Sequence, residues 1–215
     1  MNRDFGAGLV RRLGVILLGA ATLVAGCGGI NGGVVLAPLT GTGGRAFVDA
    51  GDSVKYSEVF ENGFGFGASV ILRRPAAGTV SLGDTYLLAG GEFVSFGGRP
   101  YAGGVDDASI MSGWLEAKTM LEPLGVSGKW KPYVQAGLGI VRMPEVTYAL
   151  GQVYEASFEI GLRGKLGIEM RSGKLGFYAD IGVQLTTAPN VVNPALGSGE
   201  SMVYTPIGAG IVFSF

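Results

Sequence analysis

The residues of this chain that could do chemistry are charged side chains placed among apolar ones in segments with a period of two. They comprise Glu92, Glu116, Lys118, Glu159, Arg163, Lys165, Glu169 and Asp180. Acidic and basic groups are mixed, and buried charges require partners. Inside a narrow barrel these side chains would therefore form ion pairs across the lumen. On a soluble sheet they would be solvated surface, and a functional relay is a further alternative.

The chain lacks the residues on which much enzymatic chemistry depends. Its 215 residues include one Cys and no His, which removes the usual general base and the Ser-His and Cys-His pairs. A single Cys forms no internal disulfide, and it argues against a structural zinc site. Asp106 and Asp107 stand in a glycine-rich loop without the other positions of a calcium-binding loop. We therefore expect no enzymatic activity, no cofactor and no metal site.

Glycine is abundant and alternates along some of the period-two segments. The chain contains 40 glycines, more than twice the average share of about 7%. Gly63, Gly65 and Gly67 form one alternating series, and Gly137 and Gly139 form another. No helix pattern or Walker lysine follows either series, so a phosphate-binding loop is a weak interpretation. Glycines that face a narrow barrel interior explain the alternation better.

The N-terminus has the organisation of a secretory signal. Residues 1–12 are basic, residues 13–24 form an apolar core too short for a membrane span, and small residues precede Cys27. The run VAGC resembles the lipobox of bacterial lipoproteins, and this resemblance implies cleavage before Cys27 and attachment of a lipid to its sulfur. Ordinary signal cleavage that leaves an incidental cysteine is the alternative. The GGINGG run that follows Cys27 is a flexible tether by composition.

Composition favours membrane strands over membrane helices. Mean hydropathy is +0.39 and only 15% of residues are charged, yet beyond the N-terminus no apolar stretch approaches the roughly 18 residues of a spanning helix. Alternating lipid-facing strands produce this combination. The net charge is −1 and offers no basic patch for nucleic acid.

Seven segments alternate clearly between apolar and polar or small residues, and an even number of strands is needed to close a barrel. The alternation is longest from Tyr154 to Met170, with Leu162 and Ile168 on one face and Arg163 and Glu169 on the other. The eighth strand is expected between residues 33 and 56, where GGVVLAPL and RAFVDAGDSVKY compete. The predicted organisation is a cleaved signal at 1–26, a lipidated flexible tether at 27–44 and a barrel domain at 45–215.

The connections have unequal lengths, which predicts their sides of the membrane. The run from Arg171 to Lys174 is a tight turn and is expected in the periplasm. The longer loops, 97–108, 144–152 and 188–200, are expected outside the cell. Aromatic residues near strand ends are expected in interfacial girdles; they are Tyr86, Phe93, Phe96, Trp130, Tyr133, Tyr148, Tyr154, Tyr204, Phe213 and Phe215.

Three segments carry a resemblance to a known class of proteins. KPYVQAGLGIV, KLGFYADIGVQL and the terminal IGAGIVFSF resemble strands of small bacterial outer-membrane barrels of the OmpA, OmpX and OmpW kind. The resemblance implies an all-β fold, an eight-stranded antiparallel up-and-down transmembrane barrel, in the outer membrane. It also implies that Phe215 is a C-terminal signal for the barrel-assembly machinery. Outer-membrane lipid and that machinery are the expected partners, nucleic acid is not, and the barrel is expected to be a monomer.

The sequence leaves several functions open. A structural or surface-interaction role with loops exposed outside the cell is the leading hypothesis. A narrow barrel that passes or binds small apolar solutes is one alternative, and a soluble lipocalin-like periplasmic lipoprotein is another. A membrane barrel and a lipocalin-like barrel differ in the polarity of their two faces, because a membrane barrel directs aliphatic residues outward and charges inward.

Overall fold

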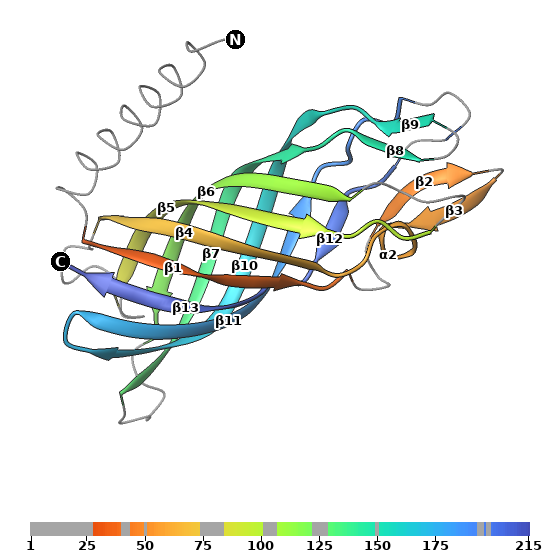
Figure 1. Cartoon of the computed structure of the whole chain (residues 1–215). Helices are drawn as coiled ribbons and strands as arrows, with labels where there is room; N and C mark the ends of the chain where they lie inside the picture. Colours follow the sequence, from red (N-terminus) through yellow and green to blue (C-terminus); the bar gives the residue numbers. More distant parts are fainter. Residues whose placement is uncertain are drawn as a thin grey trace, which may run out of the picture.

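The chain folds into a closed antiparallel β-barrel (Figure 1). The computed structural model describes residues 28–39, 44–49, 51–73, 84–100, 107–121, 129–148, 151–192, 196 and 199–215. The expected signal segment and Cys27 lie outside the described residues. The wall strands, in chain order, are β1 (Gly29–Ala37), β4 (Gly63–Arg73), β5 (Thr85–Phe96), β6 (Ala108–Met120), β7 (Trp130–Met143), β10 (Ser157–Ser172), β11 (Leu175–Thr186) and β13 (Ile207–Ser214). The predicted eight-stranded fold is confirmed.

The first and last strands close the barrel. β1 pairs antiparallel with β4 on one side and with β13 on the other, in a register that runs from Gly29 opposite Ser214 to Leu36 opposite Ile207. The short strand β12 (Met202–Tyr204) pairs with β11 just beyond β13. Pro206, which has no N–H to donate, separates β12 from β13. β12 and β13 therefore occupy the same position in the wall.

The expected flexible tether at 27–44 is wrong over half of its length, because β1 occupies Gly29–Ala37. The GGVVLAPL candidate is thus the eighth strand, and the barrel begins well before residue 45. Gly33 of this strand is required by packing, since a Cβ at this position would collide with the Tyr178 hydroxyl. The competing RAFVDAGDSVKY segment forms a separate hairpin, β2 (Arg45–Asp49) and β3 (Asp52–Lys55), which turns at Gly51 with φ of +93°.

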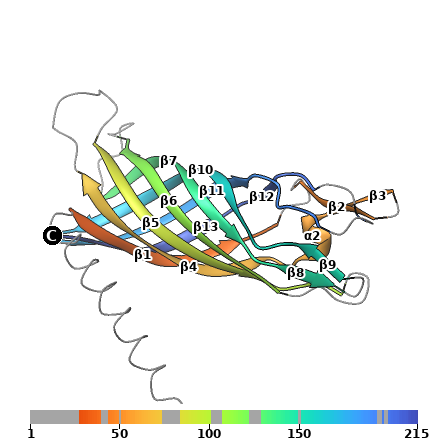
Figure 2. The same cartoon turned by 90° about the horizontal axis from the view of Figure 1, so that it is seen from above.

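The two ends of the barrel differ in the amount of structure they carry. Figures 1 and 2 show that β2, β3, the short helix α2 (Tyr56–Val59), β8 (Val146–Tyr148) and β9 (Gly151–Tyr154) all extend from one end. The opposite end holds the start of β1, the C-terminus and the tight β10–β11 turn, where Gly173 has φ of +64°. The alternation predicted to run from Tyr154 is therefore divided, because β9 ends at Tyr154 and the wall strand β10 starts at Ser157. None of the helices among the described residues is long and apolar enough to cross a membrane.

The elements at the loop-bearing end pack around a hydrophobic cluster, which we call the cap. Its members come from the wall and from the connections: Ala37, Leu39, Ala46, Phe47, Val54, Tyr56, Val59, Phe60, Val94, Phe96, Ala108, Ile110, Trp114, Val141, Met143, Val146, Val153, Tyr154, Leu196, Met202 and Tyr204. Tyr56 donates to the Glu200 carbonyl at 3.0 Å, and Tyr154 donates to the Ala46 carbonyl at 2.8 Å. Burial raises the pKa of both phenols well above the usual value near 10. These contacts hold the connections against one another.

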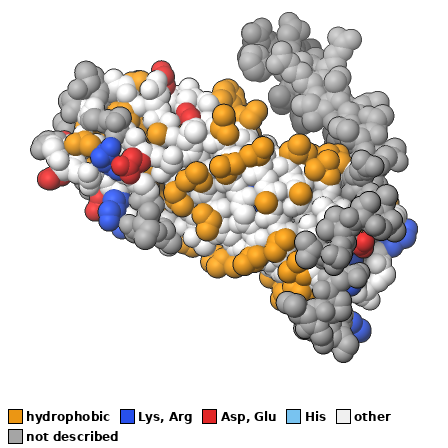
Figure 3. All heavy atoms as spheres, turned by 180° about the vertical axis from the view of Figure 1, so that it is seen from behind, with side chains coloured by type: hydrophobic (Ala, Val, Ile, Leu, Met, Phe, Trp, Pro, Cys, Tyr) orange, Lys and Arg blue, Asp and Glu red, His pale blue; other side chains and the backbone are white. Residues whose placement is uncertain are grey.

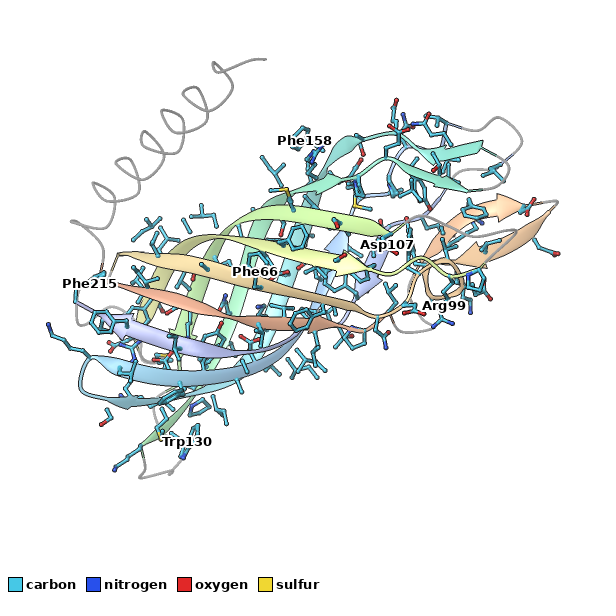
Figure 4. All side chains as sticks on the ribbon, viewed as in Figure 1. Phe66, Arg99, Asp107, Trp130, Phe158 and Phe215 are labelled. Atoms are coloured by element: carbon cyan, nitrogen blue, oxygen red, sulfur yellow. The ribbon has the colours of Figure 1, made fainter. Side chains whose placement is uncertain are left out.

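A second set of hydrogen bonds joins the loop-end connections. Arg99 Nε donates to the Phe60 carbonyl at 3.1 Å, and the Gly98 N–H donates to Asp107 at 2.8 Å. Arg99 and Asp107 lie close to the loop-bearing end in Figure 4.

The outer surface of the wall is apolar. Ile140, Phe158 and Leu166 are more than 60% exposed, and they alternate with inward-facing residues as the sequence predicts. Figure 3 shows hydrophobic side chains in bands across this face of the wall, with charged side chains toward the two ends. In β10, Leu162 and Ile168 face outward while Arg163 and Glu169 are buried inside. The described wall thus has the polarity of a membrane barrel, and the lipocalin-like alternative is wrong.

Candidate functional site

The barrel interior is the place where charged and aromatic side chains from many strands meet. An eight-stranded barrel is just wide enough for side chains to fill its inside, so large residues need small neighbours. A Cβ on Gly139 would collide with the Trp114 ring, and one on Gly137 would lie 2.5 Å from Glu116 Cγ. The alternating glycines therefore make room for Trp114 and Glu116, as their expected inward orientation requires.

Arg163 on β10 is the centre of the upper part of this interior, nearest the cap. Its Nε donates to Glu116 at 2.6 Å, a second guanidinium nitrogen contacts the other Glu116 oxygen, and Nη1 donates to Glu92 at 3.1 Å. The guanidinium also lies 4.2 Å from the centre of the Trp114 ring. Each of the three charged side chains is less than 8% exposed. Such a paired, multiply bonded guanidinium is the arrangement that makes buried charge tolerable.

A second group of ion pairs lies further from the cap. Lys118 donates to Glu169 at 2.5 Å, and the other Glu169 oxygen accepts from Arg171. Lys118 also lies 3.7 Å from the centre of the Tyr133 ring, an additional cation–π contact. Tyr133 in turn donates to Asp180 at 2.9 Å, and Lys165 lies 3.7 Å from the same carboxylate. The ring of Tyr133 therefore connects the two ion pairs.

The charges of this interior network balance. Its carboxylates are Glu92, Glu116, Glu169 and Asp180, and its cations are Lys118, Arg163, Lys165 and Arg171. Four negative groups face four positive groups, so the network is neutral without an added ion. Among the described residues no group of three or more possible metal ligands is found.

A small polar cavity of about 50 Å³ remains between these side chains. Glu92, Asp180 and Asn31 border the cavity, and each has one buried oxygen that forms no hydrogen bond with the described residues. A volume of this size accommodates about four water molecules, which could satisfy these oxygens. It is too small for an organic solute. Toward the loop-bearing end, the cap, of which Trp114 is a member, closes the interior above Arg163.

The structure brings most of the predicted charged residues together, with one departure. Glu159 is oriented to the barrel rim, where it accepts from Ser157 at 2.8 Å and contacts Thr187, and it takes no part in the network. The other seven predicted residues are buried inside. Their burial contradicts the solvated-surface interpretation.

Sequence reasoning missed several residues of the interior. Tyr133 was expected in an interfacial girdle, as were Phe96, Tyr154 and Tyr204, but all four are buried. The period-two pattern held the signal, since Tyr133 shares a face with Gln135, which also borders the cavity. The face of the strand on which an aromatic residue lies thus predicts its burial better than its distance from the strand end does. Arg171 was assigned to the turn, although the strand extends to Ser172 and carries it to Glu169.

Trp130, Phe213 and Phe215 are each between 43% and 49% exposed, and their place in an interfacial girdle stays a prediction. Phe213 and Phe215 make an edge-to-face contact with ring centres 5.5 Å apart. Trp130 and Phe215 lie toward the end opposite the cap in Figure 4. The Tyr148 side chain lies outside the described part of the structure.

Comparison with known proteins supports the fold. No family model and no curated protein matches the sequence. The structure is similar to the crystal structure of Neisserial surface protein A, with a TM-score of 0.50 over 86% of this chain and 97% of that chain, at 15% identity. The chain has the fold of a small outer-membrane β-barrel. The translocator domain of the autotransporter NalP from Neisseria meningitidis also matches over 99% of this chain and 98% of that chain, with a TM-score of 0.32 at 13% identity.

Proposed function

We propose that this barrel sits in the bacterial outer membrane as a closed scaffold that presents the cap and its connecting loops outside the cell. The observation that carries the proposal is the neutral, buried ion-pair network beneath a packed cap, inside a wall whose outer face is apolar. The network fills the lumen and the cap orders the loops. Both features suit a structural or surface-interaction role, with binding carried by the loop surface.

The interior argues against the passage of small apolar solutes. A solute in the lumen would have to replace charged groups that are paired with one another, and breaking a buried pair costs about 3–5 kcal/mol. The space between those groups is about 50 Å³. We therefore place any interaction on the outer surfaces of the molecule.

A conductance measurement tests the closed lumen. Purified barrel inserted into a planar lipid bilayer should show no sustained conductance steps at neutral pH, in parallel with an open porin as the positive control. Regular ohmic steps that scale with the amount of inserted barrel would contradict the scaffold function.

Labelling on intact cells tests the orientation. With Cys27 replaced by Ser, a single cysteine at Asp52 reports on the β2–β3 turn, and one at Lys174 reports on the β10–β11 turn; both positions are exposed. A membrane-impermeant maleimide should label the Asp52→Cys protein on intact cells, and the Lys174→Cys protein only after permeabilisation. The reverse pattern would show that the cap faces the periplasm.

We also propose that Cys27 carries a lipid, and that any such anchor joins the barrel without a flexible spacer. Gly28, the next residue, donates to the Ile71 carbonyl at 2.9 Å, and its own carbonyl accepts from the Phe215 N–H at 3.4 Å. Metabolic labelling with a radioactive fatty acid should mark the wild type and not Cys27→Ser. Equal labelling of both would contradict the proposal.

A further inference from the structure

One arginine faces outward in the apolar wall. Arg142 on β7 lies between Met111 on β6 and Phe158 on β10 in the lateral register. The same row continues through Phe93 and Phe66, whose rings stack with centres 5.5 Å apart. Arg142 is exposed, and it forms no ion pair with another residue of the described chain. Among the residues that the structure describes, no carboxylate therefore neutralises this guanidinium.

A shallow hollow adjoins this arginine on the wall. The next lateral row consists of Ala68, Gly91, Gly113 and Ile140, so three neighbouring strands carry a small residue at the same level. The hollow has a volume of about 560 Å³, and aromatic and aliphatic side chains of the Arg142 row border it, with Arg142 itself among them. A Cβ on Gly113 would meet no atom within 4 Å, which shows that the space above it is open.

The position of Arg142 along its strand places it at the level of lipid head groups. Trp130 begins β7, and Arg142 lies twelve positions further along the strand. This length corresponds to about 40 Å of strand, and to about 30 Å across the membrane at a typical tilt, against an apolar band of about 25 Å. Trp130 and Arg142 therefore mark opposite boundaries of the band. An arginine costs about 2–4 kcal/mol at the midplane and about 0–1 kcal/mol at the boundary.

We propose that Arg142 and the adjoining hollow bind one membrane lipid with an anionic phosphate head group. The guanidinium pairs with the phosphate, for which its planar geometry is suited, and an acyl chain lies over Ala68, Gly91 and Gly113. The proposal rests on the membrane location proposed above. Charge complementarity identifies the occupant, since a cation that forms no ion pair with any described residue borders an apolar surface at the head-group level.

The wall offers a second hollow that serves as a matched control. It has a volume of about 540 Å³ and is bordered by Ala136, Leu138, Leu162, Gly164 and Val183. The charged side chain near it, Arg163, is directed into the lumen, where it is 7% exposed. A Cβ on Gly164 has only one neighbouring atom at 4.0 Å. Gly113→Leu and Gly164→Leu thus fill comparable hollows, with and without an outward arginine.

The test uses full-length barrel in nanodiscs of phosphatidylcholine that contain phosphatidylglycerol or, in a second set, diacylglycerol, which lacks the phosphate. Native mass spectrometry after release counts the lipids that remain bound. Wild type should retain phosphatidylglycerol over diacylglycerol. Arg142→Gln should reduce this preference about tenfold, as expected for loss of one charge-assisted pair. Gly113→Leu should reduce retention of both lipids.

Two control variants make the outcome decisive. Lys174→Gln removes an exposed charge from the opposite end, and neither it nor Gly164→Leu should change lipid retention. An unchanged preference in Arg142→Gln, or an equal loss in Lys174→Gln, would overturn the lipid site. A dimer that Gly113→Leu abolishes would show that a second copy occupies the hollow. Failure of the wild type to enter nanodiscs would overturn the membrane location itself, whereas an inserted barrel without lipid preference would overturn only this site.

Discussion

The buried Arg163 cluster allows a sharp test of how the interior network stabilises the barrel. Arg163→Met removes the guanidinium shared by Glu116 and Glu92 and leaves two carboxylates that are 2% and 4% exposed. Removing one partner of a buried pair destabilises a protein by about 3–5 kcal/mol. Glu116→Gln leaves the pair with Glu92 and should cost about 2 kcal/mol, the value of a hydrogen bond to a charged group. The double variant Arg163→Met/Glu116→Gln restores neutrality. Its loss of unfolding free energy should therefore be smaller than the sum of the two single losses by about 1–3 kcal/mol.

The assay is urea unfolding of the barrel in lipid vesicles, followed by the shift between folded and unfolded bands on unheated detergent gels. This readout avoids the fluorescence of Trp114, whose ring contacts Arg163. Arg45→Met is the control, because Arg45 forms an exposed ion pair with Glu200 at 3.5 Å, and such pairs contribute about 0–1 kcal/mol. Additive losses in the double variant, or an Arg163→Met loss no larger than that of Arg45→Met, would refute the reasoning.

Three further predictions concern the cap, the packing and the wall. Tyr154→Phe should destabilise the barrel by about 1 kcal/mol through loss of its hydrogen bond to the Ala46 carbonyl. Because burial raises the pKa of Tyr154, the free energy of unfolding should fall as the pH rises above about 10, where the phenol of the unfolded chain ionises. Unfolding measured from pH 8 to pH 11 should therefore show a weaker decline of stability in the variant than in the wild type. Gly161→Ala places a methyl group 2.6 Å from Trp114 and should cost about 1–3 kcal/mol in the same urea assay, so unchanged stability would show that the ring has room to move. Leu162→Arg should lower folded yield in bilayers, since an arginine on the lipid face costs about 2–4 kcal/mol at the midplane; wild-type yield would mean that this face does not meet lipid.

The expected strand faces could be predicted because the period of two is a local property. Leu162 and Arg163 are assigned to opposite faces by their neighbours alone, and the structure places them so. A one-residue slip would reverse every side chain of β10, which makes the assignment robust. The same pattern contained the inward position of Tyr133. Tyr133 was nevertheless expected in a girdle, because it lies near a strand end and aromatic residues there commonly form girdles.

Other features depend on partners that are distant in the chain. The glycine-rich β1 resembles a flexible tether by composition, and it becomes a strand because β4 and β13 offer hydrogen bonds on both of its edges. Glu159 lies on the same face of β10 as the interior charges. Its position along the barrel axis, however, is at the rim, where it contacts Ser157 and Thr187. Neither the composition of a segment nor the face on which a residue lies indicates how far along the barrel axis that residue will be.

The sequence by itself thus determined the class of fold, the strand faces and the mixture of charges that had to be paired. The tertiary structure decided which charges meet. Arg163 contacts Glu116, 47 residues away, and Glu92, 71 residues away, because the registers of several strand pairs together bring them to one level of a closed barrel. The registers of neighbouring strands also decided that Arg142, with an ordinary outward parity, stands beside a hollow built from three other strands. Register and closure are long-range properties, since they depend on the sum of all strand pairings around the wall, whereas alternation is set by each residue and its two neighbours.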